Sequence, residues 1–287
     1  MPENEDKYPT QSGRRRFVKG VVGSAALSGV AAGTAATVNS ATSSGGAGGG
    51  TTQFIAIENT AGPAPRGMPV IPIEIDGGEL SGLWPEVREI QEGGRTIQIA
   101  EQDVGGVTYS SAWFQYCGVQ QYSSAQPSTE ANNTFLAGGG YDWMESVERG
   151  EPLTVDMFDD YEEWGNGIGR EGIGKPASAT WRQPEEGRGM PVQVIRSVEV
   201  EKMANGEGRY ASLPGDVRSF ISAATQDGFL AWLNKCTHFC CTPGFKNDPG
   251  SEQYGGGDRV YCQCHQSLYN PFSPVRAQFV ALPRPLE

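Results

Sequence analysis

Basic residues are scarce in this sequence. Its 287 residues include 22 lysines and arginines against 34 aspartates and glutamates, giving a formal net charge of −12, and only six of the basic residues are lysines. The chain lacks the basic stripe of proteins that contact phosphates, so we expect no nucleic-acid partner. An acidic, lysine-poor, glycine-rich composition is typical of proteins from salt-loving organisms, because salt screens the repulsion between hydrated carboxylates. An ordinary acidic secreted protein is the alternative.

Histidine is scarcer still, with two residues in the whole chain. His238 lies in residues 236–241, Cys-Thr-His-Phe-Cys-Cys, and His265 lies in residues 262–269, Cys-Gln-Cys-His-Gln-Ser-Leu-Tyr. We call these segments the first and the second box. A chain of this length can bury a real core, so its six cysteines are not needed as a disulfide scaffold. Their concentration around the two histidines indicates a metal site.

Each box offers one cysteine and one histidine on a tight loop. Together they supply two thiolates and two imidazoles, the ligand set of a binuclear iron–sulfur cluster with unequal ligation of its two irons. Zinc accepts the same four ligands tetrahedrally, but zinc sites generally use Cys-x-x-Cys spacing, which the boxes do not have. A non-redox surface binding protein with a zinc-stabilised domain is therefore the less favoured reading.

The boxes resemble those of Rieske iron–sulfur proteins, whose pattern is Cys-x-His-x-Gly-Cys followed by Cys-x-Cys-His-x-Ser-x-Tyr. Eight of the nine patterned positions are present in register, and only the glycine differs, being Cys240 here. The resemblance covers roughly residues 170–287. It implies one 2Fe-2S cluster, with Cys236 and Cys262 on the inner iron and His238 and His265 on the outer one.

The resemblance also implies roles for residues around the ligands. The Ser267 hydroxyl would donate to a bridging sulfide and the Tyr269 hydroxyl to the sulfur of Cys236, both favouring a high potential. A disulfide between Cys241 and Cys264 is implied as well, although adjacent Cys240 leaves a swapped pairing open. Cys117 and Cys240 are then either a second bridge or two free thiols. Phe239 takes the apolar tip position, and the proline-rich loop that covers the cluster is represented only by Pro274 or by residues 282–285.

The N-terminal residues predict export and membrane attachment. Residues 1–13 are polar and predict a disordered cytoplasmic tail, and residues 14–19, Arg-Arg-Arg-Phe-Val-Lys, fit the twin-arginine export pattern. Residues 20–38 are uncharged and weakly apolar, long enough for a helix of about 28 Å that just spans a hydrocarbon core of about 30 Å. We predict a signal over residues 14–38 that is retained as a membrane anchor, with cleavage near Ala36 or Ala41 as the alternative. The cluster domain would lie on the extracytoplasmic side.

Beyond the anchor, residues 39–53 are rich in Gly, Ser and Thr and predict a flexible linker. Residues 54–165 are loop-rich, contain no recognised catalytic motif and are interpreted as an elaboration of unknown role. Residues 166–287 are the predicted Rieske domain, with a cluster-binding subdomain at about 234–272. Residues 167–172, Gly-Ile-Gly-Arg-Glu-Gly, spell a dinucleotide fingerprint but lack its strand–turn–helix context, so we interpret them as turns.

Alternating or continuous apolar runs predict strands. The predicted segments are 70–75, 96–100, 107–117, 177–181, 191–195, 229–233 and 259–262, with a short surface helix at 155–164. The expected fold class is all-β: an antiparallel Rieske-type domain with an inserted cluster-binding subdomain, preceded by the N-terminal signal or transmembrane helix.

These features predict an electron-transfer subunit that is not catalytic alone. By resemblance it would accept an electron and a proton from quinol, with His238 and His265 as the reacting side chains, in contact with a cytochrome b subunit of a bc-type complex. A cytochrome c or a small copper protein would take the electron. The small Rieske subunit of a molybdenum oxidase such as arsenite oxidase is the alternative from the same family.

Overall fold

The computed structural model describes residues 50–92, 94–117, 132–183 and 189–281. The predicted tail, signal and anchor, and residues 39–49 of the predicted linker, lie outside this part of the chain. A strand begins at Gly50, inside the segment predicted as linker. Within the described ranges no helix is long and apolar enough to cross a membrane.

The described residues form mostly β-strands. The strands are β1 (Gly50–Ala61), β2 (Met68–Ile71), β3 (Ile73–Asp76), β4 (Glu79–Gly82), β5 (Val87–Glu92), β6 (Arg95–Val104), β7 (Val107–Ser110), β8 (Leu136–Ala137), β9 (Lys175–Trp181), β10 (Met190–Arg196), β11 (Phe229–Leu233), β12 (Gly244–Phe245), β13 (Val260–Cys262) and β14 (Ser267–Ala281). The helices are α2 (Val198–Asn205), α3 (Gly215–Ala224) and five short 3₁₀ helices: η1 (Ser111–Phe114), η2 (Asp142–Ser146), η3 (Val155–Phe158), η4 (Gly208–Ser212) and η5 (Pro249–Tyr254).

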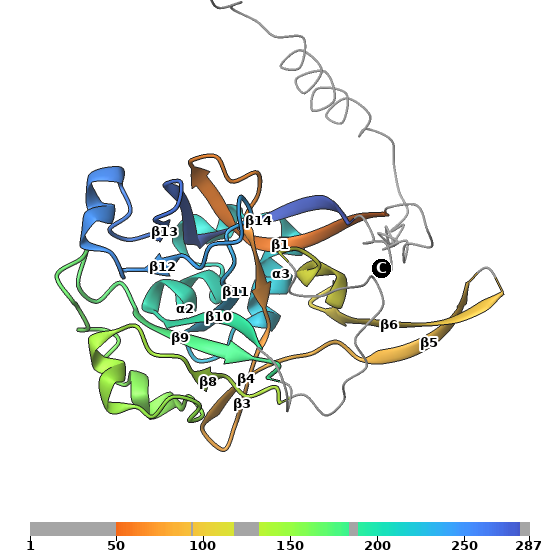
Figure 1. The fold of residues 1–287 in the computed structure, drawn as a ribbon, viewed down its shortest axis with the longest axis horizontal. Coiled ribbons are helices and arrows are strands. Elements are labelled where there is room, and N and C mark those ends of the chain that lie inside the picture. Colours follow the sequence, from red (N-terminus) through yellow and green to blue (C-terminus); the bar gives the residue numbers. More distant parts are fainter. Residues whose placement is uncertain (1–49, 93, 118–131, 184–188, 282–287) are drawn as a thin grey trace, which may run out of the picture. The chain divides into compact units, whose positions relative to one another are not determined.

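Nine strands make one curled sheet in the order β12-β13-β14-β1-β2-β11-β10-β9-β8, and every paired neighbour is antiparallel (Figure 1). Two smaller antiparallel sheets, β3-β4 and β5-β6-β7, are separate from this large sheet. The prediction of an antiparallel, mainly β chain is thus confirmed at this level. β11 lies in mid-sheet and all five of its residues are buried, as expected for an uninterrupted apolar run.

Some local predictions differ from the structure. The strand predicted over residues 107–117 ends at Ser110, because the Ser110 hydroxyl accepts from the Ala112 amide and starts η1. The helix predicted over residues 155–164 is the single turn η3. Residues 167–172 contain no helix or strand, so their interpretation as turns is confirmed.

Two α-helices between β10 and β11 were not predicted. α3 buries Val217, Phe220, Ile221 and Ala224, which lie at the i, i+3, i+4, i+7 spacing of an apolar helix face. α2 is capped by the Ser197 side chain and ends in a left-handed glycine. The two helices pack on each other and contact the sheet at β11 and β14.

Residues 107–114 are anchored in the core by aromatic side chains. Trp113 is fully buried, and its ring lies 5.1 Å from Tyr109, 5.3 Å from Phe220 and 6.3 Å from Phe54. Phe114 is also fully buried and packs edge-on against Trp181 at 5.6 Å. Because η1 is held from two sides, the residues that follow it, Tyr116 and Cys117, have a fixed position.

We expect Trp113→Ala to lower the free energy of unfolding by about 3–5 kcal/mol, because it leaves a large cavity among rings that cannot close it. The control is Ser222→Ala on the exposed side of α3, for which a change within about 0.5 kcal/mol is expected. Urea unfolding followed by tryptophan fluorescence and circular dichroism measures both. Equal unfolding midpoints would contradict the anchoring role of Trp113.

Candidate metal centre

The two boxes meet at one end of the sheet. Cys236 follows β11 after two residues, and Cys262 is the last residue of β13. Their sulfurs are hydrogen bonded to each other, and neither belongs to a disulfide. The rings of His238 and His265 lie edge-to-face with their centroids 4.7 Å apart. All four predicted ligands are therefore brought together in two pairs, sulfur with sulfur and imidazole with imidazole.

The pairs differ in depth. Cys236 and Cys262 are 1% and 0% exposed, whereas His238 is half-buried and His265 is exposed. Nδ1 of His238 is a buried nitrogen with no hydrogen-bond partner. A buried polar atom normally has a partner, so an orphaned imidazole nitrogen beside a second imidazole fits a metal ligand. The donor set and this orphaned atom both fit an inner thiolate-held and an outer imidazole-held iron.

The spacing of the donors also bears on the zinc alternative. Four ligands of one zinc ion, at about 2.0–2.3 Å from it, lie within roughly 4 Å of one another. Among the described residues, the group of three donor atoms within 4.8 Å of one another is Cys241, Cys262 and Cys264, and it includes neither histidine. Two of its sulfurs form a disulfide, which leaves Cys262 as its free thiol. The four predicted ligands are thus more widely spread than a single-ion site requires.

The two boxes have the same backbone closure. In the first box the Cys240 amide donates to the Cys236 carbonyl at 3.0 Å, and in the second the Gln266 amide donates to the Cys262 carbonyl at 2.8 Å. The closing residue is left-handed in both, with φ 65° at Cys240 and 60° at Gln266. Such a conformation favours glycine, and a side chain there costs about 1–2 kcal/mol. The loops therefore keep a glycine-type turn without glycine.

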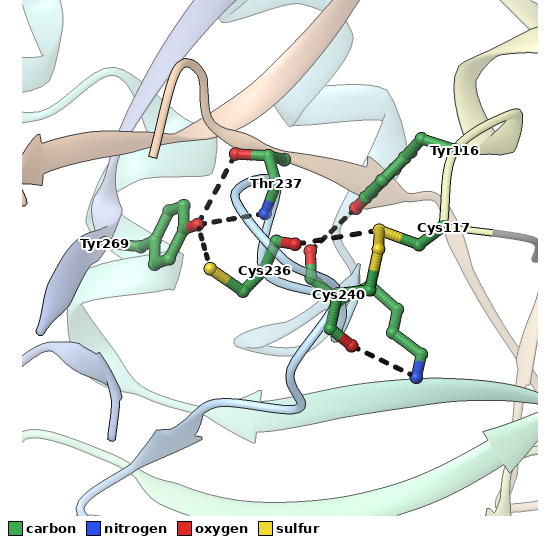
Figure 2. Close-up of a disulfide and its surroundings, with 7 residues drawn as sticks. Tyr116, Cys117, Cys236, Thr237, Cys240 and Tyr269 are labelled. Atoms are coloured by element: carbon green, nitrogen blue, oxygen red, sulfur yellow. Dashed lines mark hydrogen bonds between the residues drawn. A yellow bond between two sulfur atoms is a disulfide. The ribbon is translucent and has the colours of Figure 1, made fainter. Parts of the chain in front are cut away.

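Tyr269 and Thr237 hold the sulfur of Cys236 in place. The Tyr269 hydroxyl donates to Sγ of Cys236 at 3.2 Å, as the resemblance implies, and accepts from the Thr237 amide at 3.2 Å (Figure 2). Both residues are buried. The Cys262 thiol also donates to Cys236, which lowers the pKa of Cys236 against the opposing effect of burial and raises that of Cys262.

A disulfide joins Cys241 to Cys264 and so ties the first box to the second, which confirms that implied pairing. A second disulfide joins Cys117 to Cys240, settling the alternative left open for these two residues (Figure 2). The adjacent Tyr116 hydroxyl donates to the Lys235 carbonyl at 3.0 Å. Residues 116–117, which belong to the segment of unknown role, therefore brace the first box from η1.

A third loop, residues 62–67 (Gly-Pro-Ala-Pro-Arg-Gly), lies against both boxes. The Ala64 amide donates to the Ser267 hydroxyl at 3.1 Å, and the Thr237 hydroxyl donates to the Arg66 carbonyl at 2.6 Å. A Cβ at Gly62, which has φ 84°, would lie 2.5 Å from the Ser267 Cα, so only glycine allows this approach. We call residues 62–67 the covering loop.

Neither of the two segments that the sequence offered as a proline-rich loop over the site is the loop that contacts the boxes in the described structure. Pro274 lies in β14 opposite Ile57, and residues 282–285 lie outside the described part of the chain. The contacts of the covering loop with the first and second boxes join residues 171 and 203 positions apart, and β1 brings the loop there by pairing Ala61 with Leu268. The two prolines between glycines could have marked residues 62–67 as a rigid loop, but the sequence could not show that this loop contacts the boxes.

No family model, no curated protein and no solved structure matches this chain. The assignment of the site therefore depends on the residues themselves.

We expect removal of the Cys117–Cys240 bridge to lower the free energy of unfolding by about 2–5 kcal/mol, since the bridge closes a long loop. The comparison is between Cys117→Ser/Cys240→Ser and Cys117→Ser/Cys240→Gly, measured by urea unfolding. Glycine tolerates the φ of 65° at position 240, so the second variant should recover about 1 kcal/mol. Equal stability of the two variants would show that the turn relaxes once the bridge is gone.

Proposed function

We propose that this chain is a Rieske-type iron–sulfur subunit, with Cys236 and Cys262 holding the inner iron and His238 and His265 the outer iron of one 2Fe-2S cluster. The observation that carries the proposal is that the four donors lie in two pairs at different depths. The two sulfurs are buried, and the two imidazoles lie farther out, one of them with a buried nitrogen that has no hydrogen-bond partner. When bound, such a cluster supplies one-electron transfer at about −150 to +300 mV, because neutral imidazoles replace two thiolates.

The outer face of the site suits a partner that gives up an electron and a proton together. With Nδ1 of His238 directed inward, Nε2 is the nitrogen left to hold a proton. Phe239 is 65% exposed, and its ring lies 4.2 Å from the His238 ring and 5.1 Å from the His265 ring. An exposed aromatic ring beside two imidazoles offers an apolar contact next to proton acceptors, which are the two features that a quinol headgroup needs.

The hydrogen bonds at the sulfur favour the upper part of this range of potentials. Tyr269 donates to Cys236, and the Ser267 hydroxyl accepts from Ala64 while its own proton remains available to a sulfide. Donors of this kind stabilise the more negative, reduced state. We therefore favour quinol oxidation in a cytochrome bc-type complex, with a cytochrome b subunit as partner and a cytochrome c or small copper protein as acceptor. A membrane tether at residues 14–38 and an extracytoplasmic location are part of the proposal.

The test is metal analysis and a redox titration of the purified protein across pH. We expect two irons and two inorganic sulfides per chain, and an electron paramagnetic resonance signal with a low average g-value on reduction. The midpoint potential should be high and should fall as pH rises, because the imidazoles take up protons with the electron. Zinc in place of iron would refute the proposal, and a low midpoint independent of pH would remove quinol oxidation.

Tyr269→Phe should lower the midpoint potential by roughly 60 mV, the one-electron equivalent of a tenfold change, because Cys236 loses a hydrogen bond that strengthens on reduction. The matched control is Tyr254→Phe, an exposed tyrosine outside the boxes and the covering loop, which should leave the potential unchanged. Titration with spectroscopic detection measures both. A larger shift in the control than in Tyr269→Phe would argue against the assigned role of Tyr269.

A further inference from the structure

The covering loop places a cationic residue, Arg66, beside the first box. The Arg66 carbonyl accepts the Thr237 hydroxyl, next to the ligand Cys236. The guanidinium carbon of Arg66 lies 4.5 Å from the ring centroid of Phe279 and 5.3 Å from that of Tyr116. Arg66 therefore sits between β14 and the residues that brace the first box.

This half-buried cation has no acidic partner among the described residues. None of the ion pairs between described residues includes Arg66, and its Nε is buried without a hydrogen-bond partner. Burial lowers the pKa of Arg66, although an arginine stays charged at neutral pH. A partly buried charge loses part of its hydration, and stacking on two rings compensates for only some of that loss.

The groups that face Arg66 indicate where the opposite charge arises. The Tyr116 ring lies against the Arg66 guanidinium, and the Tyr116 hydroxyl donates to the Lys235 carbonyl, next to Cys236. Tyr269 donates to the Cys236 sulfur, which is the atom that would carry negative charge as a metal ligand. A cation here stabilises the state of the centre with more negative charge.

We propose that Arg66 is an electrostatic positioning residue of the metal centre, whose guanidinium compensates the thiolate side and favours the reduced over the oxidised state. The inference rests on the proposed function, since it assigns a residue of this chain to the tuning of that centre. Arg66 lies in segment 54–165, so the inference gives part of this otherwise unexplained segment a role at the metal centre.

The experiment measures the midpoint potentials of three variants of the full chain, Arg66→Gln, Arg66→Met and Arg66→Lys, and compares them with that of the unmodified protein. The two neutral variants should shift the ratio of reduced to oxidised centres at the original midpoint about tenfold toward the oxidised form, equivalent to about 59 mV for one electron. Arg66→Lys, which keeps the charge but loses the planar stacking, should stay close to the original potential. Methionine keeps apolar contact with the two rings in case glutamine is not tolerated.

Arg276→Gln is the matched control, because it removes the same charge from an exposed side chain on β14 that is paired with Asp216. Its effect on the potential should be small and should vanish at high salt, whereas the effect of Arg66→Gln should persist. A purely structural role for Arg66 predicts a lower unfolding midpoint with an unchanged potential, or equal potential shifts in the lysine and glutamine variants, and either result overturns the inference.

The spectrum separates failure of this inference from failure of the proposed function. If the unmodified protein shows no iron–sulfur signal on reduction, both are refuted. If the signal is present with the same g-values in all variants but the potential does not respond to the charge at position 66, the inference about Arg66 alone is refuted.

Discussion

The antiparallel pairing of β1 with β14 is the constraint on which the candidate centre depends. The two strands are the longest in the described part of the chain and lie side by side near the middle of the large sheet (Figure 1). Register shifts between Ile57 and Glu58, and again between Asn59 and Ala61, place Ala61 opposite Leu268. One further residue brings Gly62 against Ser267, in the second box. A slip of this register would separate the covering loop from both boxes.

The centre is thus a product of three distant parts of the chain. The boxes supply the ligands, the covering loop supplies hydrogen bonds to Ser267 and Thr237, and residues 116–117 supply a brace and a disulfide. The buried aromatic anchor at Trp113 and Phe114 fixes the brace. The sequence predicts segment 54–165 to be an elaboration, but most of β1, the covering loop and the brace come from it. Strands of both predicted segments pair in one sheet.

The sequence predicted those parts of the site that depend on residue type and short spacing. The two boxes are local patterns, and the Tyr269 hydrogen bond and the Cys241–Cys264 bridge are what their resemblance to Rieske proteins implies. About half of the described strands follow from apolar runs, but the two longest, β1 and β14, were not predicted. The covering loop and the Cys117–Cys240 bridge could not be placed in the same way, because each joins residues more than 120 positions apart. α3 was missed although its apolar residues have helical spacing, because Pro214 stands at the position where Ser, Thr, Asp or Asn would mark a helix start.

Cys240 and Cys241 are neighbours, yet each is bonded to a different part of the chain, while Cys236 and Cys262 stay reduced in the same small volume. Oxidation of an unfolded chain would readily join the wrong partners, including the two that must remain thiols. The correct pattern is selected only if the sheet has already formed and the inner sulfurs are protected before an oxidant arrives. The arrangement therefore implies an order of maturation: the sheet folds and brings the two inner sulfurs together before the two bridges form.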